Sequence, residues 1–395
     1  MAVRKFYISL LLCMTQIITM RAQLFEHLSD DCYFMDTTQL RVLSVELDAL
    51  TFFRDNEYNS SLTKGYSLPG LWITPKLEYN PNDNIHLELG FNALMYNGAN
   101  KYPNYAYHDI STWKGQQYQS GAHLKPWFRA QLNTKHFTYV LGNIYGGSNH
   151  KLTEVMFNPE QNISADPETG FQILIDYDFM HFDTWINWQS YIFEEDSHQE
   201  AFTVGANINF LLHKNKRLKL SIPIQALAQH RGGEQNIVKL GVQTLINGMT
   251  GIAAEYDFRN NFFRTLNVNL GTYGCFQQSG KLWPKSTGHA YNAEASLNVW
   301  KYFNVKYGYF RAPKYYANLF GSPLFSTYSI KTNSELFRGM TTHYLRLDYS
   351  RTYHNNYIIG ANIDIVHNKS QNTRELNSSF GIYLKLKPSF MIKAM

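Results

Sequence analysis

The sequence is poor in cysteine and has no long apolar stretch beyond its N-terminus. Only 3 of its 395 residues are cysteines. Cys13 lies in an apolar N-terminal run, so Cys32 and Cys275 could form at most one disulfide, and a disulfide framework is excluded. No Cys or His spacing typical of a metal site occurs, and we expect neither a metal nor a cofactor. After the N-terminus, no segment approaches the roughly 20 apolar residues that a membrane helix requires, which excludes a helical membrane protein.

Charge is neither abundant nor clustered. The chain has 36 Lys and Arg against 31 Asp and Glu, with a net charge of +5. The basic residues occur singly, which excludes a nucleic-acid surface. No change of composition, Pro/Gly linker or charge run divides the chain. We therefore expect a single domain.

Aromatic residues are abundant: 28 Tyr, 26 Phe and 7 Trp. The mean hydropathy is nevertheless −0.36, a value typical of soluble proteins. This combination is typical of a transmembrane β-barrel, in which every second residue of a strand faces water. A large soluble all-β protein is the alternative.

The N-terminus has the features of an export signal. Arg4 and Lys5 precede an apolar run from Ile8 to Met20, and cleavage is predicted after Ala22. We therefore predict a signal peptide at 1–22 and a single outer-membrane barrel domain at 23–395, with 23–41 as an N-terminal periplasmic segment.

Alternating segments from about Val42 onward are separated by connections of two kinds, and short and long connections follow one another strictly. Outer-membrane barrels have this asymmetry, with short periplasmic turns and long extracellular loops. The pattern predicts an all-β fold, a transmembrane antiparallel up-and-down barrel of about 16 strands, with 18 as the alternative. The predicted turns lie near 81–84, 133–135, 180–181, 214–216, 260–261, 301–302 and 354–355, and the predicted loops span 55–70, 98–118, 147–168, 194–199, 230–247, 277–288, 312–336 and 368–374.

The segment 379–387 near the C-terminus alternates without exception, with Phe380, Ile382, Leu384 and Leu386 on one face. It resembles the C-terminal signal of Gram-negative outer-membrane β-barrel proteins, which has a polar residue, a Gly and two hydrophobic positions, here Ser379, Gly381, Leu384 and Leu386. The chain departs from the usual aromatic terminus and continues to Met395. The resemblance implies an integral protein of the bacterial outer membrane, with outer-membrane lipid and the barrel assembly machinery as partners.

The two faces of the predicted strands differ in polarity. Apolar rows such as Ile85, Leu87, Leu89 and Phe91 are predicted to face lipid. The opposite faces carry charges, which cannot face hydrocarbon without a cost of several kcal/mol. We predict that the following residues line the pore: Glu46, Asp48, Lys76, Glu78, Glu88, Lys125, Arg129, Asp176, Asp178, Asp183, Lys219, Glu255, Glu294, Lys306, Arg346, Asp364 and Lys385.

The charges of neighbouring strands often have opposite sign, as for Glu88 and Lys125, Glu294 and Lys306, or Asp364 and Lys385. Two interpretations follow. The charged walls could set up a field across an aqueous pore, or the charges could neutralise one another in a structural network. A barrel of this size normally leaves a channel, which favours the pore.

Two predicted loops contain aromatic residues among amides, namely Tyr105, Tyr107 and Trp113 in the second loop and Tyr315 and Tyr316 in the seventh. Such rings suit sugars, but a lid stabilised by its own aromatic packing is the simpler interpretation. Ser148-Asn149-His150 places a nucleophile type beside a base type, although adjacent side chains tend to point apart. We therefore expect no enzymatic activity.

The predicted function is a porin-like channel for passive passage of small hydrophilic solutes, with saccharides as one candidate class. The alternative is a surface receptor, or a polysaccharide-binding or assembly protein, anchored by the barrel.

Overall fold

The computed structural model of the chain describes residues 39–97, 120–192, 198–233, 241–332, 334–335, 337–354 and 356–394. The predicted signal peptide, Cys32, and the second-loop aromatics Tyr105, Tyr107 and Trp113 lie outside these residues. None of the helices among the described residues is long and apolar enough to cross a membrane.

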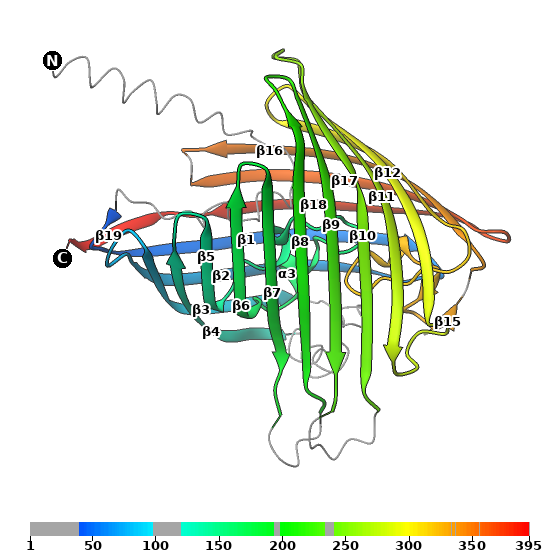
Figure 1. Cartoon of the computed structure of the whole chain (residues 1–395), viewed down its shortest axis with the longest axis horizontal. Coiled ribbons are helices and arrows are strands. Elements are labelled where there is room, and N and C mark those ends of the chain that lie inside the picture. Colours follow the sequence, from blue (N-terminus) through cyan, green and yellow to red (C-terminus); the bar gives the residue numbers. More distant parts are fainter. Residues whose placement is uncertain are drawn as a thin grey trace.

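Sixteen antiparallel strands form a closed barrel, as predicted (Figure 1). Each strand pairs with the next along the chain, and β1 closes the ring by pairing with the last wall strand, β18. The wall strands are β1 (Val42–Asn59), β2 (Lys64–Tyr79), β3 (Ile85–Asn97), β4 (Ser120–Asn133), β5 (Phe137–Asn143), β6 (Thr169–Tyr177), β7 (Met180–Ser190), β8 (Ala201–Lys214), β9 (Leu218–Arg231), β10 (Gln243–Asp257), β11 (Phe263–Ser279), β12 (Thr287–Val299), β13 (Phe303–Ala312), β16 (Met340–Tyr353), β17 (Tyr357–Lys369) and β18 (Arg374–Leu386).

The remaining elements are short. The pair β14 (Tyr328–Ser329) and β15 (Ser334–Glu335), and the helices η3 (Gly147–His150), α3 (Gln161–Ser164) and η4 (Pro323–Phe325), belong to two long loops. The strand β19 (Ser389–Ala394) continues β18 along β1, because Ser389 pairs with Glu46 and Ala394 pairs with Val42. The residues that follow the predicted closing strand therefore lengthen it.

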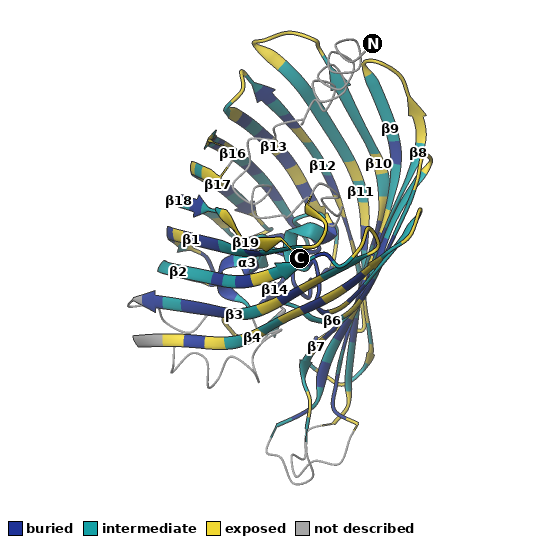
Figure 2. Cartoon of the chain, turned by 90° about the vertical axis from the view of Figure 1, so that its left-hand side faces the viewer, coloured by how far each residue is buried: buried dark blue, intermediate teal, exposed yellow. Residues whose placement is uncertain are grey.

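Along each strand, residues that face outward alternate with residues that face inward, and the two sets differ in polarity. In β17, Ile359, Ile363 and Ile365 are exposed, whereas Asn362 and Asp364 between them are buried. Exposed isoleucines are stable only where lipid covers them, and buried polar groups only where they find partners. Bands of buried and exposed residues alternate along the strands in Figure 2. The outer surface of the wall is therefore the apolar one.

Several strands are longer than predicted. The predicted loop 55–70 contains the end of β1 and the start of β2, so that only 60–63 connect them. The strand β10 begins at Gln243, so the last residues of the predicted loop 230–247 lie inside it. The polar outward residues of these segments resemble loop residues. They remain in strands because paired strands of a barrel can continue beyond the hydrocarbon into water.

Part of the barrel interior is apolar. A single cluster of buried side chains joins the long loops after β5 and β13 to residues of the wall, such as Leu245, Tyr273 and Phe310. In both views the helix α3, which belongs to the loop after β5, lies within the ring of strands (Figures 1 and 2). Loops thus occupy space that would be open in an empty barrel.

Candidate functional site

Two loops fold into the barrel: the connection from β5 to β6 (144–168) and that from β13 to β16 (313–339), here called the inner loops. The backbone N–H of Asn158 donates to the carbonyl of Phe320 at 2.7 Å, and that of Ser322 donates to Glu154 at 3.3 Å. At Gly321, a Cβ would lie 2.0 Å from the carbonyl oxygen of Val155, so only glycine permits this approach. The inner loops therefore pack against each other inside the barrel.

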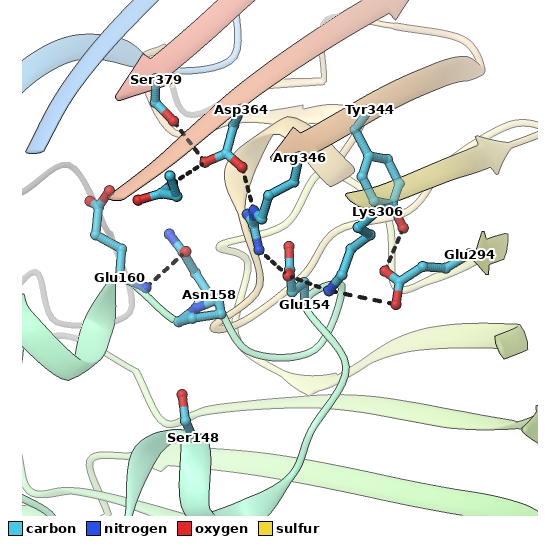
Figure 3. Close-up of polar contacts among 12 residues, drawn as sticks. Ser148, Glu154, Asn158, Glu160, Glu294, Lys306, Tyr344, Arg346, Asp364 and Ser379 are labelled. Carbon is cyan, nitrogen blue, oxygen red and sulfur yellow. Dashed lines mark hydrogen bonds and ion pairs between the residues drawn. The ribbon is translucent and has the colours of Figure 1, made fainter. Parts of the chain in front are cut away.

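Glu154 binds the first inner loop to the wall. Its carboxylate accepts from Lys306 Nζ at 3.0 Å and forms an ion pair with Arg346. Lys306 also lies 3.6 Å from Glu294, and Tyr344 donates to Glu294 at 2.9 Å (Figure 3). Burial would raise the pKa of Glu154, but Arg346 and Lys306 lower it. Each buried charge here thus has a partner of opposite sign, without which burial would be costly.

The same network continues to Glu160, further along the first inner loop. Arg54 Nε donates to Glu160 at 2.5 Å, and its Nη2 lies 3.2 Å from Asp364. Asp364 also pairs with Arg346 and accepts from Ser379 Oγ at 2.8 Å (Figure 3). Strands β1, β13, β16, β17 and β18 are thereby connected through one loop. Glu154 and Glu160 could not be identified as these partners from the sequence pattern.

A second network lies on β1 to β4. Lys76 Nζ is 3.1 Å from Glu46, 3.2 Å from Glu78 and 2.8 Å from Glu88. Arg129 is also bonded to Glu88, at 3.1 Å. Glu78, Glu88 and His86 have the geometry of a metal site. The ammonium of Lys76 lies within hydrogen-bond distance of both carboxylates, so each of them already has a cationic partner.

Register explains which predicted charge pairs form. Glu294 lies beside Lys306, as predicted. Glu88, however, pairs with Arg129 rather than Lys125, because β3 and β4 place Glu88 opposite Arg129. Lys125 instead lies 3.5 Å from Asp166.

The third predicted pair concerns the closing strand. Asp364 pairs with Arg346 rather than with Lys385. Lys385 lies 3.7 Å from Asp48, and Lys387, just after β18, lies 3.7 Å from Glu46, so both ion pairs join the end of the closing strand to β1.

The other predicted lining residues are spread around the wall. Asp183 is buried against His150, and Asp176 lies 2.6 Å from His181. Lys219 and Glu255 are opposite each other on β9 and β10. Asp178 lies in the exposed turn between β6 and β7, not on the inner wall. The role of these residues as pore lining stays a prediction.

The aromatics of the second inner loop are packed. Tyr315 and Tyr316 are 2% and 0% exposed. The ring of Tyr316 meets Tyr273 edge-on at 6.4 Å and Phe310 at 5.9 Å. No ring face is left for a sugar, so the interpretation as a self-packed lid fits these two residues. Cys275 lies in the same cluster as a buried free thiol.

Ser148 and His150 do not form a nucleophile–base pair. Ser148 Oγ accepts from Asn162 Nδ2 at 2.6 Å. Both ring nitrogens of His150 face carboxylates, Nδ1 that of Asp183 at 2.7 Å and Nε2 that of Glu168 at 3.3 Å. Burial would lower the pKa of His150, but these carboxylates raise it to about 9. The ring is therefore a charged anchor for the loop, with no lone pair to accept a proton.

The outer wall has an exceptional region at its loop-side end, which we call the outer rim. The cross-strand row Tyr291–Arg311–Thr341–Lys369–Arg374 runs over β12, β13, β16, β17 and β18. Its three basic residues are exposed. Arg311 Nη1 donates to Thr341 Oγ1 at 2.7 Å. No ion pair is formed by Arg311, Lys369 or Arg374 within the described part of the chain.

The next row toward the membrane centre contains Tyr309, His343, His367 and Leu376. His343 Nδ1 lies 2.8 Å from the hydroxyl of Tyr307, and its ring meets that of Tyr309 edge-on at 5.1 Å. The outer rim was not predicted from the sequence, because functional residues were expected on the inner face. The signal was present, because polar residues replace apolar ones at outward positions of β13, β16 and β17.

Comparisons with known proteins support the fold and identify a family. A family model described as "Lipid A 3'-O-deacylase-type" matches residues 35–395. Among solved structures, OccAB4 of Acinetobacter baumannii is 8% identical with a TM-score of 0.50, over 90% of this chain and 100% of that chain. OccK5 (OpdH) of Pseudomonas aeruginosa is 8% identical with a TM-score of 0.50, over 90% and 99%. No curated protein matches the chain.

A third structure, the outer membrane protein OpdK of P. aeruginosa, is 8% identical with a TM-score of 0.49, over 89% of this chain and 100% of that chain. The predicted fold and the location as an integral outer-membrane protein are confirmed. The expectation that the chain has no enzymatic activity is wrong, because the matched family is one of deacylases. That expectation rested on Ser148 and His150 alone, and it left the outer face out of account.

Proposed function

The chain belongs to the lipid A 3′-O-deacylase-type family, and we propose that it is an outer-membrane esterase that removes an ester-linked acyl chain from a lipid of the outer leaflet. The observation that supports this site is the His343–Tyr307 pair, which places an imidazole on the lipid-facing wall near the loop-side end of β16. Histidine is the commonest general base in such chemistry.

The location of the substrate ester decides which histidine can act. Acyl esters of membrane lipids lie at the boundary between the acyl chains and the headgroups. A base for them must face lipid at that depth. His150 lies inside the barrel with both ring nitrogens facing carboxylates. His343 lies on the outer wall between the basic row and the apolar positions Leu345 and Leu347.

The pair supplies the elements of a hydrolysis. With Nδ1–H donating to the Tyr307 oxygen, Nε2 of His343 keeps its lone pair and can take a proton from water. The hydroxide oxygen attacks the acyl carbonyl carbon, and the carbon–oxygen bond to the lipid alcohol breaks. The proton on Nε2 passes to that alcohol oxygen, which leaves a free fatty acid and a lipid with one acyl chain fewer.

Mass spectrometry of fatty acid released from lipid A in detergent micelles tests this proposal. Replacing His343 by Gln should lower the rate by at least about a hundredfold, the contribution typical of a general base. Tyr307→Phe should have a smaller effect. His213→Gln, an exposed histidine near the short-turn end of β8, is the matched control. Full activity of His343→Gln would show that another residue is the base, and no release by the wild type would contradict the function.

Passage of small hydrophilic solutes, including saccharides, is a second proposal. It is supported by the inner face of β16, where both carboxylate oxygens of Asp348 are buried without a hydrogen-bond partner among the described residues. Such a group requires water or an ion. A steady conductance in planar bilayers, lost when the inner loops are cross-linked to the wall, would support passage. A silent bilayer would contradict it.

A further inference from the structure

The outer rim carries basic charge that no acidic group of the described chain neutralises. On the inner wall, Lys76, Lys306 and Arg346 each contact at least two carboxylates. Arg311, Lys369 and Arg374 are exposed, and none of them contacts a carboxylate of the described residues. Arg311 donates a hydrogen bond to the hydroxyl of Thr341. Exposed cations that the fold leaves uncompensated are available to an anionic ligand.

The geometry points to phosphate groups of a lipid as that ligand. Adjacent strands lie about 4.8 Å apart, so Arg311 and Lys369 are roughly 10 Å apart and Arg374 lies one strand further on. Immediately toward the membrane centre, Leu376 is 64% exposed and Ile365 is 42% exposed. A basic row above an apolar wall is complementary to a molecule with an anionic headgroup and acyl chains.

Other exposed charged residues lie on the elements next to this row. Lys314, three residues after Arg311, and Arg338 are both exposed, and a hydrogen bond of 2.7 Å from the Gly339 N–H to the Lys314 carbonyl holds their segments together. On the other side, β1 carries the exposed Glu57, which lies opposite Ser378 of β18, four residues along that strand from Arg374.

We propose that the outer rim of β13, β16, β17 and β18 is a docking site for the phosphate groups of an outer-leaflet glycolipid, with Arg311, Lys369 and Arg374 as its cations. The acyl chains of this lipid lie along the apolar wall below the rim. The statement that this lipid is also the substrate rests on the proposed function, because the row adjoins His343. The binding itself requires only the charges and the apolar wall.

Binding of lipid A to the purified protein in uncharged detergent tests the site. The triple variant Arg311→Gln, Lys369→Gln and Arg374→Gln should bind on the order of a hundredfold more weakly, because each basic residue near a membrane surface contributes about a factor of five. Dephosphorylated lipid A should bind the wild type as weakly. Raising the salt concentration should weaken binding by the wild type more than binding by the triple variant. Equal binding by the triple variant, or of dephosphorylated lipid, would overturn the proposal.

Controls separate this site from the proposed catalysis. The variant Lys214→Gln, Lys216→Gln and Arg217→Gln removes the same charge at the short-turn end and should bind normally. His343→Gln should bind lipid A normally but release no fatty acid. Normal binding without release by the wild type would contradict only the function, and release by the triple variant with an unchanged KM would contradict only the docking site. If the triple variant does not fold, Lys369→Gln and Arg374→Gln alone should each bind about fivefold more weakly.

Discussion

Basic side chains occur on both faces of this barrel, and the two faces use them differently. Inside, Arg346 is held by Asp364 and Glu154, and those carboxylates bind Arg54 and Lys306 in turn. Outside, Arg311 donates to the hydroxyl of Thr341 and forms no ion pair with any described residue. Paired charges hold elements together, whereas unpaired charges remain available to a ligand. This difference supports a structural role for the inner charge networks and the proposed role of the outer rim in ligand recognition.

The largest difference between the two faces should appear when one arginine is removed from each. Arg346→Ala leaves Asp364 and Glu154 short of a partner inside the barrel, and breaking a buried pair costs about 3–5 kcal/mol. Arg311→Ala should change the free energy of unfolding by less than about 0.5 kcal/mol. Urea unfolding in detergent measures both. Similar losses in the two variants would remove the distinction between the faces.

Depth on the outer wall provides the next test. Ile363 is 45% exposed in the middle of β17, where an arginine costs about 2–4 kcal/mol, whereas near the membrane boundary it costs about 0–1 kcal/mol. Ile363→Arg should therefore reduce the heat-modifiable folded fraction strongly, and His367→Arg only slightly. An equal reduction would mean that the outer rim does not lie at the boundary of the membrane.

A pH titration tests the inner anchor His150. Its pKa is about 9 in the folded chain and about 6.5 when unfolded. The protonated ring therefore stabilises the fold fully below about pH 6.5, and this contribution of about 3 kcal/mol is lost as the pH rises through 9. The difference in unfolding free energy between wild type and His150→Gln should shrink over that range. A difference that is constant from pH 6 to pH 10 would contradict the ion pairs with Asp183 and Glu168.

The contact between the inner loops should give the smallest effect. Gly321→Val places a side chain against the Val155 carbonyl, and overpacking of this kind costs about 1–3 kcal/mol. Gly241→Val, where no atom lies within 4 Å of the added Cβ, is the control. Limited proteolysis should cut the inner loops faster in Gly321→Val. Unchanged cutting would show that the loops do not depend on each other.

The sequence was sufficient to predict the strands of the barrel wall but not the loops that fold into the barrel. Strict alternation, as in Ile359 to Ile365, reveals strands and their faces because the period of two is local. Register is not local, so the predicted partners of Glu88 and Asp364 were wrong although both residues face inward. The folding of Glu154 and Glu160 into the barrel depends on contacts across the whole chain, which no pattern of neighbouring residues shows.

The candidate site was missed for a different reason. The outward positions of β17 pass from Ile365 to His367 and Lys369, and this change is visible in the sequence alone. Only the structure shows that Arg311 and Arg374 join the same row, because their strands are separated from β17 by loops of unrelated length.

Photo-cross-linking tests most directly that the outer rim is the functional face. A cross-linking amino acid would replace Leu376 below the rim, or Leu141 on β5, which are 64% and 58% exposed on the outer wall. With lipid A in bilayers, we expect a cross-linked lipid at position 376 and much less at position 141. The excess should disappear when Arg311, Lys369 and Arg374 are replaced by Gln. Equal cross-linking at both positions, with or without these three residues, would contradict the assignment of recognition to the outer rim.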